Sequence, residues 1–219
     1  ATIANANQLK SWINQVHGPT QLINSDIRPV PLDFIFCSAK GFHPLLNKKK
    51  NGIHPNCKVW RSPKGQKNKV KVGRLVQPKS PSISFVISKL FDQNMLPAIY
   101  FIFSRKGCDR ALENINHLTL VNYKEANLIS QRLKQYTKHN QEGIKDNVHF
   151  EALKKGIASH HAGLLPAWKE LVEELFQQGL IKVVFATETL AAGINMPART
   201  TIISSLSKRS EDGHRLLFS

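Results

Sequence analysis

Three short runs of the sequence place polar side chains directly after apolar, strand-like segments. Ser104-Arg105-Lys106-Gly107 follows one such segment, and Ser159-His160-His161-Ala162-Gly163 follows another. A third run starts at Thr187 and continues through Gly193 to Asn195. Hydroxyls, cations and main-chain amides of this kind suit oxygen-rich ligands such as phosphates. The alternative for the first run is an ordinary solvated turn.

The adjacent histidines of the second run, His160 and His161, are less suited to metal chemistry. Neighbouring side chains of an extended chain point in opposite directions, so the pair should not chelate one metal ion. We expect one histidine in the core and one exposed, and the sequence shows no obvious acidic partner for either. The third run contains no evident nucleophile or metal cluster.

The elements that position these runs follow from hydrophobic periodicity. Apolar runs predict buried strands at 98–103 and 181–186, and shorter strands are expected at 34–36, 156–158 and 201–204, with 119–121 as a further candidate. Helical spacing predicts helices over 5–16, 83–94, 108–115, 124–136 and 150–155. Another helix should run from Pro166 to Gly179, with its inward face formed by Trp168, Leu171, Leu175 and Phe176.

Strands that alternate with helices of this length predict an α/β fold with a mainly parallel sheet flanked by helices. Ligands bind such sheets at the loops that follow the carboxyl ends of the strands. The three polar runs occupy such loops. The predicted fold therefore gives them a position suited to binding.

The charge of the chain is strongly basic. Thirty-one Lys and Arg residues against fifteen Asp and Glu give a formal net charge of +16, which indicates a polyanionic partner such as nucleic acid rather than a small acidic substrate. No acidic residue stands between Asp33 and Asp92, whereas thirteen basic residues do. The rest of the chain carries a net charge of only about +3 by the same count. The chain is thus near neutral apart from one very basic segment.

Most of these cations lie between Ser38 and Ser80, a stretch that has the composition of a loop-rich insertion with room for a short hairpin. Together with Phe42 and Trp60 they could hold RNA phosphates and stack a base. The alternative is a solvated spacer. A zinc site is a third possibility, but the spacing of its candidate ligands fits no standard finger, so we predict no bound metal. Those ligands are Cys37, His43, His54 and Cys57.

Several runs, in order, resemble the signatures of the superkiller-type branch of superfamily 2 helicases. Residues 186–200 resemble motif V, 156–166 resemble another signature of this branch, and 98–106 look like motif IV. Arg28-Pro29-Val30-Pro31-Leu32 is similar to the segment entering the second RecA-like domain, and Ala1-Thr2 looks like the end of motif III. The resemblance covers residues 1–36 and 82–219, and its details are most similar to cyanobacterial or chloroplast members.

This resemblance implies a DExH-box RNA helicase, in which two RecA-like domains clamp ATP and grip a nucleic-acid strand. Residues 1–27 would be the tail of the first RecA-like domain and a linker, and 28–219 the second domain, truncated at its end and carrying the insertion 38–80. The residues implied to contact nucleic-acid backbone oxygens are Ser104, Arg105, His161 and Thr187. Gly193 and Asn195 would face the nucleotide, and Ala1 and Thr2 would belong to the coupling motif.

The sequence departs from the family in the groups that perform ATP chemistry. It has no Gly-rich run followed by Lys and Ser or Thr, and no Asp-Glu pair to hold magnesium. The last arginine motif would be expected beyond Ser219, and both ends look like cuts inside a longer chain. We therefore expect a fragment that hydrolyses no ATP and binds no cofactor by itself, from a protein that uses ATP and magnesium at full length.

The implied partners are single-stranded or partly duplex RNA and the first RecA-like domain of the same chain. RNA rather than DNA rests on the resemblance, so the alternatives are a DNA helicase of the same superfamily and a non-enzymatic basic RNA-binding module. Three cysteines are too few for a disulfide framework, and no apolar run is long enough to span a bilayer. We expect a cytoplasmic protein with no membrane partner.

Overall fold

The computed structural model describes residues 5–25, 30–49, 51–55, 57, 80–140, 147–191, 196–210 and 213–216, with side chains omitted at 147, 191 and from 207 onward. The chain divides into two compact units. One comprises Ala1–Phe36 with His43–Lys64, and the other comprises Cys37–Phe42 with Gly65–Ser219. These two units have other bounds than the two predicted domains, and the predicted domain boundary between residues 27 and 28 stays a prediction.

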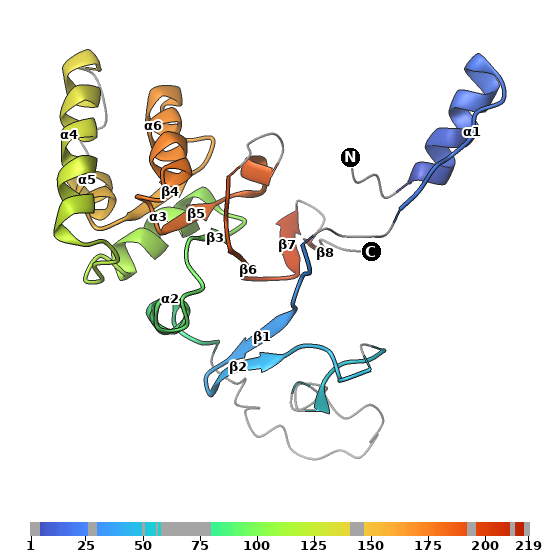
Figure 1. Ribbon diagram of the computed structural model, residues 1–219, viewed down its shortest axis with the longest axis horizontal. Coiled ribbons are helices and arrows are strands. Elements are labelled where there is room, and N and C mark those ends of the chain that lie inside the picture. The colour runs from blue at the N-terminus through green and yellow to red at the C-terminus, as the bar shows by residue number, and fades with distance from the viewer. Residues whose placement is uncertain are drawn as a thin grey trace. The chain divides into compact units, whose positions relative to one another are not determined.

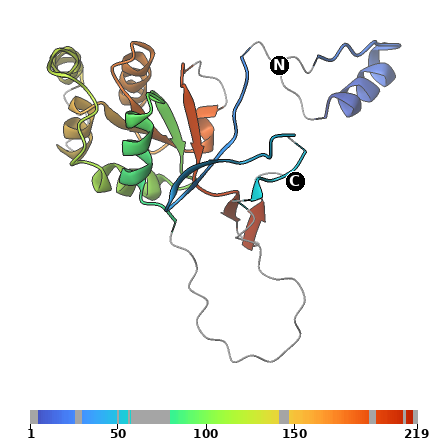
Figure 2. The same ribbon diagram turned by 60° about the horizontal axis from the view of Figure 1, so that its bottom comes forward.

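The larger unit contains a four-stranded parallel sheet whose strands lie side by side in both views (Figure 1, Figure 2). Its order is β4-β5-β3-β6, and every neighbouring pair is parallel. The bounds are Ala98–Phe101 for β3, Ile157–His160 for β4, Val183–Ala186 for β5 and Thr200–Ile203 for β6. The prediction of an α/β fold with a mainly parallel sheet is confirmed.

Helices cover both faces of this sheet. The buried residues of β5 alternate between two apolar clusters: Val183 and Phe185 pack with α2 (Ile83–Asp92) and α3 (Arg105–Asn114), whereas Val184 packs with α4 (Tyr123–His139) and α6 (Pro166–Gln177). This alternation is the two-residue period of a strand buried on both faces. The short helix α5 (Asn147–Lys154) contributes to both clusters.

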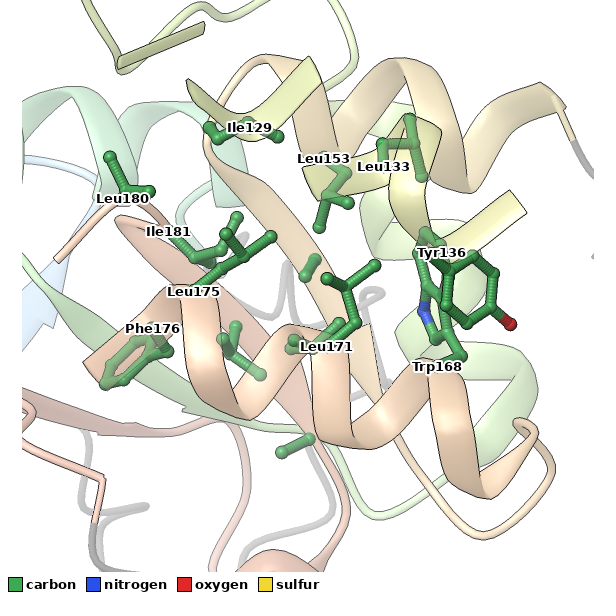
Figure 3. Packing of buried hydrophobic residues seen from close by; sticks show 14 of the residues in the cluster. Ile129, Leu133, Tyr136, Leu153, Trp168, Leu171, Leu175, Phe176, Leu180 and Ile181 are labelled. Carbon is green, nitrogen blue, oxygen red and sulfur yellow. The ribbon is translucent and has the colours of Figure 1, made fainter. Parts of the chain in front are cut away.

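The cluster on the α4 and α6 side is organised around Trp168, which is completely buried. The ring of Tyr136 meets the Trp168 ring edge-on at 5.5 Å, and the Phe150 ring stacks on it at 5.4 Å. Figure 3 shows Leu171 and Leu175 following Trp168 along the same side of α6. The predicted inward face of this helix is confirmed.

Local sequence explains where the helices begin. The hydroxyl of Ser82 accepts a hydrogen bond from the Phe85 N–H at the start of α2. Asn122 and Glu125 form a reciprocal capping box at the start of α4, in which each side chain accepts from the other residue's main-chain N–H. Pro166 occupies the first turn of α6, where its missing N–H costs no hydrogen bond. Such caps satisfy helix-end donors that would otherwise remain unpaired.

A glycine is required immediately before β4. Gly156 has a φ of +79°, and a Cβ added there would lie 2.5 Å from Val121 Cγ1. The chain can therefore turn from α5 into the sheet only with no side chain at this position. The prediction of a strand at 119–121 is wrong. Within this segment the Leu120 N–H donates one hydrogen bond to the Lys155 carbonyl, and no ladder forms.

Two hairpins complete the described strands. β1 (Ile35–Ser38) pairs with β2 (Gly41–Pro44), as expected for a short hairpin at the start of the insertion. β7 (Ser207–Ser210) and β8 (Gly213–Leu216) form an antiparallel pair that the periodicity did not predict. Strands of four residues offer too few positions for an alternating pattern to stand out.

The smaller unit contains α1 (Ala6–His17), which confirms the helix predicted at 5–16. None of its residues is buried, and Trp12 is 58% exposed. Gly18, with a φ of +98°, follows its last turn. Within the described part of the chain, no helix is both long and apolar enough to cross a bilayer.

Candidate functional site

The three polar loops lie at one edge of the sheet. The last residues of neighbouring strands are in register, because Ala186 of β5 pairs with Phe101 of β3 on one side and with His160 of β4 on the other. The strands are parallel, so the chain leaves all three at the same edge (Figure 1). Ser104, His161 and Thr187 therefore follow three adjacent strand ends, as the sequence predicts.

The loop after β3 leads directly into α3. Ser104 is the N-cap of this helix, and its Oγ accepts a hydrogen bond of 3.2 Å from the Gly107 N–H. The hydroxyl proton of Ser104 remains free to be donated to a ligand oxygen. The close approach needs a glycine at 107, because a Cβ there would lie 2.8 Å from Ile102 Cγ2. The helix thus begins at Arg105, three residues earlier than predicted.

Arg105 provides an available positive charge at this edge. Its side chain is exposed, and in the described part of the chain no carboxylate pairs with it. It also stands in the first turn of α3, where the main-chain N–H groups and the helix dipole favour an anion. A phosphate oxygen is the ligand that this combination suits best.

His161 is held inside the loop that follows β4. The Gly163 N–H donates to its Nδ1 at 3.1 Å, so Nε2 must carry the ring proton, which is donated to Asp109 Oδ1 at 3.0 Å. The residue is only 4% exposed. Both ring nitrogens are occupied by protein partners, and the groups that this loop exposes to a ligand are at Ala162 and Gly163.

The network continues inward from Asp109. His149 Nε2 lies 3.7 Å from the same oxygen, Asp109 Oδ1, and His149 Nδ1 lies 3.2 Å from Ser159 Oγ. Serine, histidine and aspartate in this order are the groups of a nucleophilic triad. Ser159, however, is completely buried within β4, so no substrate can reach its hydroxyl. The network is structural.

His160 corrects two expectations drawn from the sequence. It is 5% exposed, so both histidines are buried rather than one, and its Nε2 lies 2.6 Å from Glu173 Oε1. Both histidines therefore have an acidic partner, Glu173 on α6 for His160 and Asp109 on α3 for His161. These partners lie 13 and 52 residues away in the sequence, on helices that cover opposite faces of the sheet, so no local pattern could reveal them.

Thr187 follows β5 directly. It is 8% exposed, and its Oγ1 lies 3.0 Å from Oγ1 of Thr189 in the short 3-10 turn Glu188–Ala191. Thr189 itself is exposed. The pair presents hydroxyl groups at the same edge as Ser104. A hydroxyl that the sequence argument did not single out, that of Thr189, thus belongs to this site.

The cysteines offer no reactive thiolate at this site. Burial and, to a lesser extent, the charge of Asp109 together raise the pKa of Cys108 to about 12, against the opposing effect of a main-chain hydrogen bond. Burial also raises the pKa of Cys37. Among the described residues, no three His, Cys, Asp or Glu side chains converge to hold a metal ion.

Four of the predicted site residues, Gly193, Asn195, Ala1 and Thr2, lie outside the described residues.

No family model matches the chain. Among curated proteins, it is 38% identical to a chloroplastic DExH-box ATP-dependent RNA helicase of Arabidopsis thaliana, over 96% of the chain and 21% of that protein. It is 36% identical to a probable helicase, HelY, of Mycobacterium tuberculosis, over 98% of the chain and 26% of that protein. It is 34% identical to the exosome RNA helicase MTR4 of Homo sapiens, over 95% of the chain and 21% of that protein.

The chain belongs to the superkiller-type DExH-box helicases. The relatives match nearly its whole length, so the resemblance inferred from the motifs is confirmed and the parallel sheet is that of a RecA-like fold. The chain spans about a fifth to a quarter of the length of these helicases. A cyanobacterial or chloroplast-like origin stays a prediction.

Proposed function

We propose that this chain is the second RecA-like domain of an ATP-dependent RNA helicase, with residues 1–27 contributed by the end of the first domain and a linker. The observation that carries the proposal is the 38% identity, over 96% of the chain, to a protein whose name describes an ATP-dependent RNA helicase. The strongly basic composition agrees with a nucleic-acid partner.

In this proposal the carboxyl edge of the sheet is the nucleic-acid track. Arg105 would pair with a phosphate, and the hydroxyls of Ser104 and Thr187 would bind backbone oxygens. His161 would contribute through the main chain of its loop, because both of its ring nitrogens already have partners. Contacts of this kind position a strand without reading its sequence.

The basic insertion would add affinity to that of this edge. Residues 38–80 hold twelve Lys and Arg and no Asp or Glu, which suits a phosphate backbone and implies strong salt dependence. Most of the insertion, residues 58–79, lies outside the described residues. Its charge favours an RNA-binding element over the alternative of a solvated spacer.

ATP and magnesium would serve the full-length protein. Gly193 and Asn195 are the residues proposed to face the nucleotide. The described residues do not fit a triphosphate cradle, because no Gly-rich turn followed by Lys and Ser or Thr occurs in the chain. No chemical step is therefore assigned to this chain, whose own residues would bind and orient the nucleic acid.

The proposed partners are single-stranded or partly duplex RNA and the first RecA-like domain in cis. We place the protein in the cytoplasm, on the ground that the number of its cysteines suits a reducing compartment. A DNA helicase of the same superfamily and a non-enzymatic RNA-binding module are the competing functions.

The test is ATP hydrolysis by the full-length protein with single-stranded RNA, single-stranded DNA or neither, together with separation of a partly duplex RNA. We expect RNA to stimulate hydrolysis at least tenfold more than DNA does, and the isolated chain to hydrolyse no ATP. Stimulation by DNA alone would indicate the DNA helicase instead. RNA binding without any hydrolysis would indicate the binding module.

A further inference from the structure

Asp109 has no part in the sequence signatures, yet it connects three elements at the carboxyl edge of the sheet. It stands on α3, and its Oδ1 accepts from His161 Nε2 at 3.0 Å in the loop after β4. The same oxygen lies 3.7 Å from His149 Nε2 on α5. His161 is only 4% exposed, so losing Asp109 would leave its buried Nε2 without its hydrogen-bond partner.

The bond from Asp109 fixes the conformation of the loop through His161. With the proton on Nε2, Nδ1 can only accept, and it accepts from the Gly163 N–H at 3.1 Å. The Leu164 N–H closes the same turn on the His161 carbonyl at 3.1 Å. A loss of the carboxylate removes one of the two contacts that keep the proton on Nε2, and so weakens the hold of Nδ1 on Gly163.

The fixed loop lies directly beside Arg105. A Cβ placed on Gly163 would be 3.5 Å from Arg105 Cδ and 3.1 Å from His161 Nδ1, so the arginine stem and the loop are in close proximity. Arg105 and Asp109 are four residues apart on α3, which puts them on one face of the helix. One helical turn thus presents the free cation to solvent and anchors the neighbouring loop.

We propose that Asp109 is a positioning residue of the nucleic-acid track: through His161 it holds the loop 161–164 against the first turn of α3, so that the Gly163 main chain and Arg105 face one strand together. This inference deepens the proposed function and rests on it. Asp109 itself need not touch the nucleic acid.

The sign of the effect separates this role from simple electrostatics. Asp109 is 39% exposed on its side chain, close to a surface proposed to bind a polyanion. Its negative charge alone would repel phosphates, so its removal should leave RNA binding unchanged or tighter. A positioning role has the opposite consequence, because removal would disorder the loop and weaken binding.

The experiment compares Asp109→Ala and Asp109→Asn in the full-length protein, with Glu113→Ala as the matched control. Glu113 is an exposed carboxylate on the same helix. Affinity for a single-stranded RNA oligonucleotide and hydrogen exchange at the Gly163 amide are measured. We expect Asp109→Ala to weaken RNA binding about tenfold and to speed Gly163 exchange by a similar factor, as befits a hydrogen bond to a charged group. Asp109→Asn, which keeps an acceptor oxygen, should retain most of the RNA affinity and most of the protection of the Gly163 amide. Glu113→Ala should reduce neither the affinity nor the protection.

Unchanged Gly163 exchange in a folded Asp109→Ala protein would overturn the inference, as would faster exchange with RNA affinity equal to or above that of the wild type. If Asp109→Ala does not fold, His161→Asn with the same two measurements replaces it, and the same outcomes decide. A wild-type protein that binds no RNA would overturn the proposed function instead, while Gly163 exchange would still show whether Asp109 holds the loop.

Discussion

Arg105 lies at the carboxyl edge with an exposed side chain and no carboxylate partner among the described residues, so its charge is available to a phosphate. Its neighbours at that edge already have protein partners: Ser104 caps α3, His161 is bonded at both ring nitrogens, and Thr187 contacts Thr189. A hydroxyl that accepts one bond can still donate another, whereas a fully bonded imidazole cannot. We therefore expect Arg105 to contribute directly to the salt-dependent affinity of this edge.

Replacing Arg105 by alanine should remove one phosphate contact. We expect weaker binding of single-stranded RNA and a slope of log affinity against log salt that is shallower by about 0.7. Titrations at several salt concentrations measure both. Lys89→Ala is the control, because Lys89 is an exposed cation in the last turn of α2, just before the opposite edge of the sheet. An equal change of slope in the two variants would mean that bulk charge, not the placed arginine, governs binding.

For single residues, the sequence predicts the place of a side chain in the fold better than its hydrogen-bond partner. Residues that follow strand ends can be read from hydrophobic runs, which is why Ser104, His161 and Thr187 were placed together correctly. The bond between His161 and Asp109 depends on how α3 packs beside β4, and nothing near either residue in the sequence encodes it. Whether these side chains contact nucleic acid stays a prediction.

The start of α4 shows how an element is fixed by a few polar groups. Glu125 completes the capping box with Asn122 and also accepts a bond of 2.7 Å from Lys182 Nζ, next to the start of β5. Burial alone would raise the pKa of Glu125, but the hydrogen bond from Lys182, the Asn122 N–H and the lysine charge together lower it below its ordinary value of 4.5. This carboxylate therefore stabilises the fold in its ionised form.

Glu125→Gln keeps a capping side chain but loses the charge. Because the folded-state pKa of Glu125 is lowered, its contribution is complete above the unfolded value and is lost as the pH falls through the folded one. We expect the variant to be less stable by about 0.5–1 kcal/mol at neutral pH, with the difference vanishing in acid. Urea unfolding over this pH range measures it. A difference that persists unchanged in acid, or an equal loss in the exposed control Glu170→Gln, would contradict the assignment.

Among the elements, the helices and the four strands of the parallel sheet were predicted well, whereas the β7–β8 hairpin was missed and the strand expected at 119–121 does not form. The apolar face of α6 repeats over three turns with Pro166 at its start, so its position and burial follow from the sequence. The β7–β8 hairpin and the absence of a strand at 119–121 depend on pairing between segments, which four residues cannot signal on their own.

For the whole molecule, the net charge of +16 is misleading unless it is divided along the chain. The basic stretch between Asp33 and Asp92 holds most of the excess, and the sheet edge has only a few placed groups. We therefore expect nucleic-acid binding to depend on the geometry at the carboxyl ends of β3, β4 and β5. Bulk charge would predict binding centred on the insertion instead.

Hydrogen exchange of the full-length protein, with and without single-stranded RNA, tests this claim most directly. We predict that RNA protects amides of residues 104–107 and 161–163 and those around Thr187, whatever it does to residues 58–79. Protection that spares all three loops, whether it is confined to the basic insertion or absent from the chain, would contradict the account.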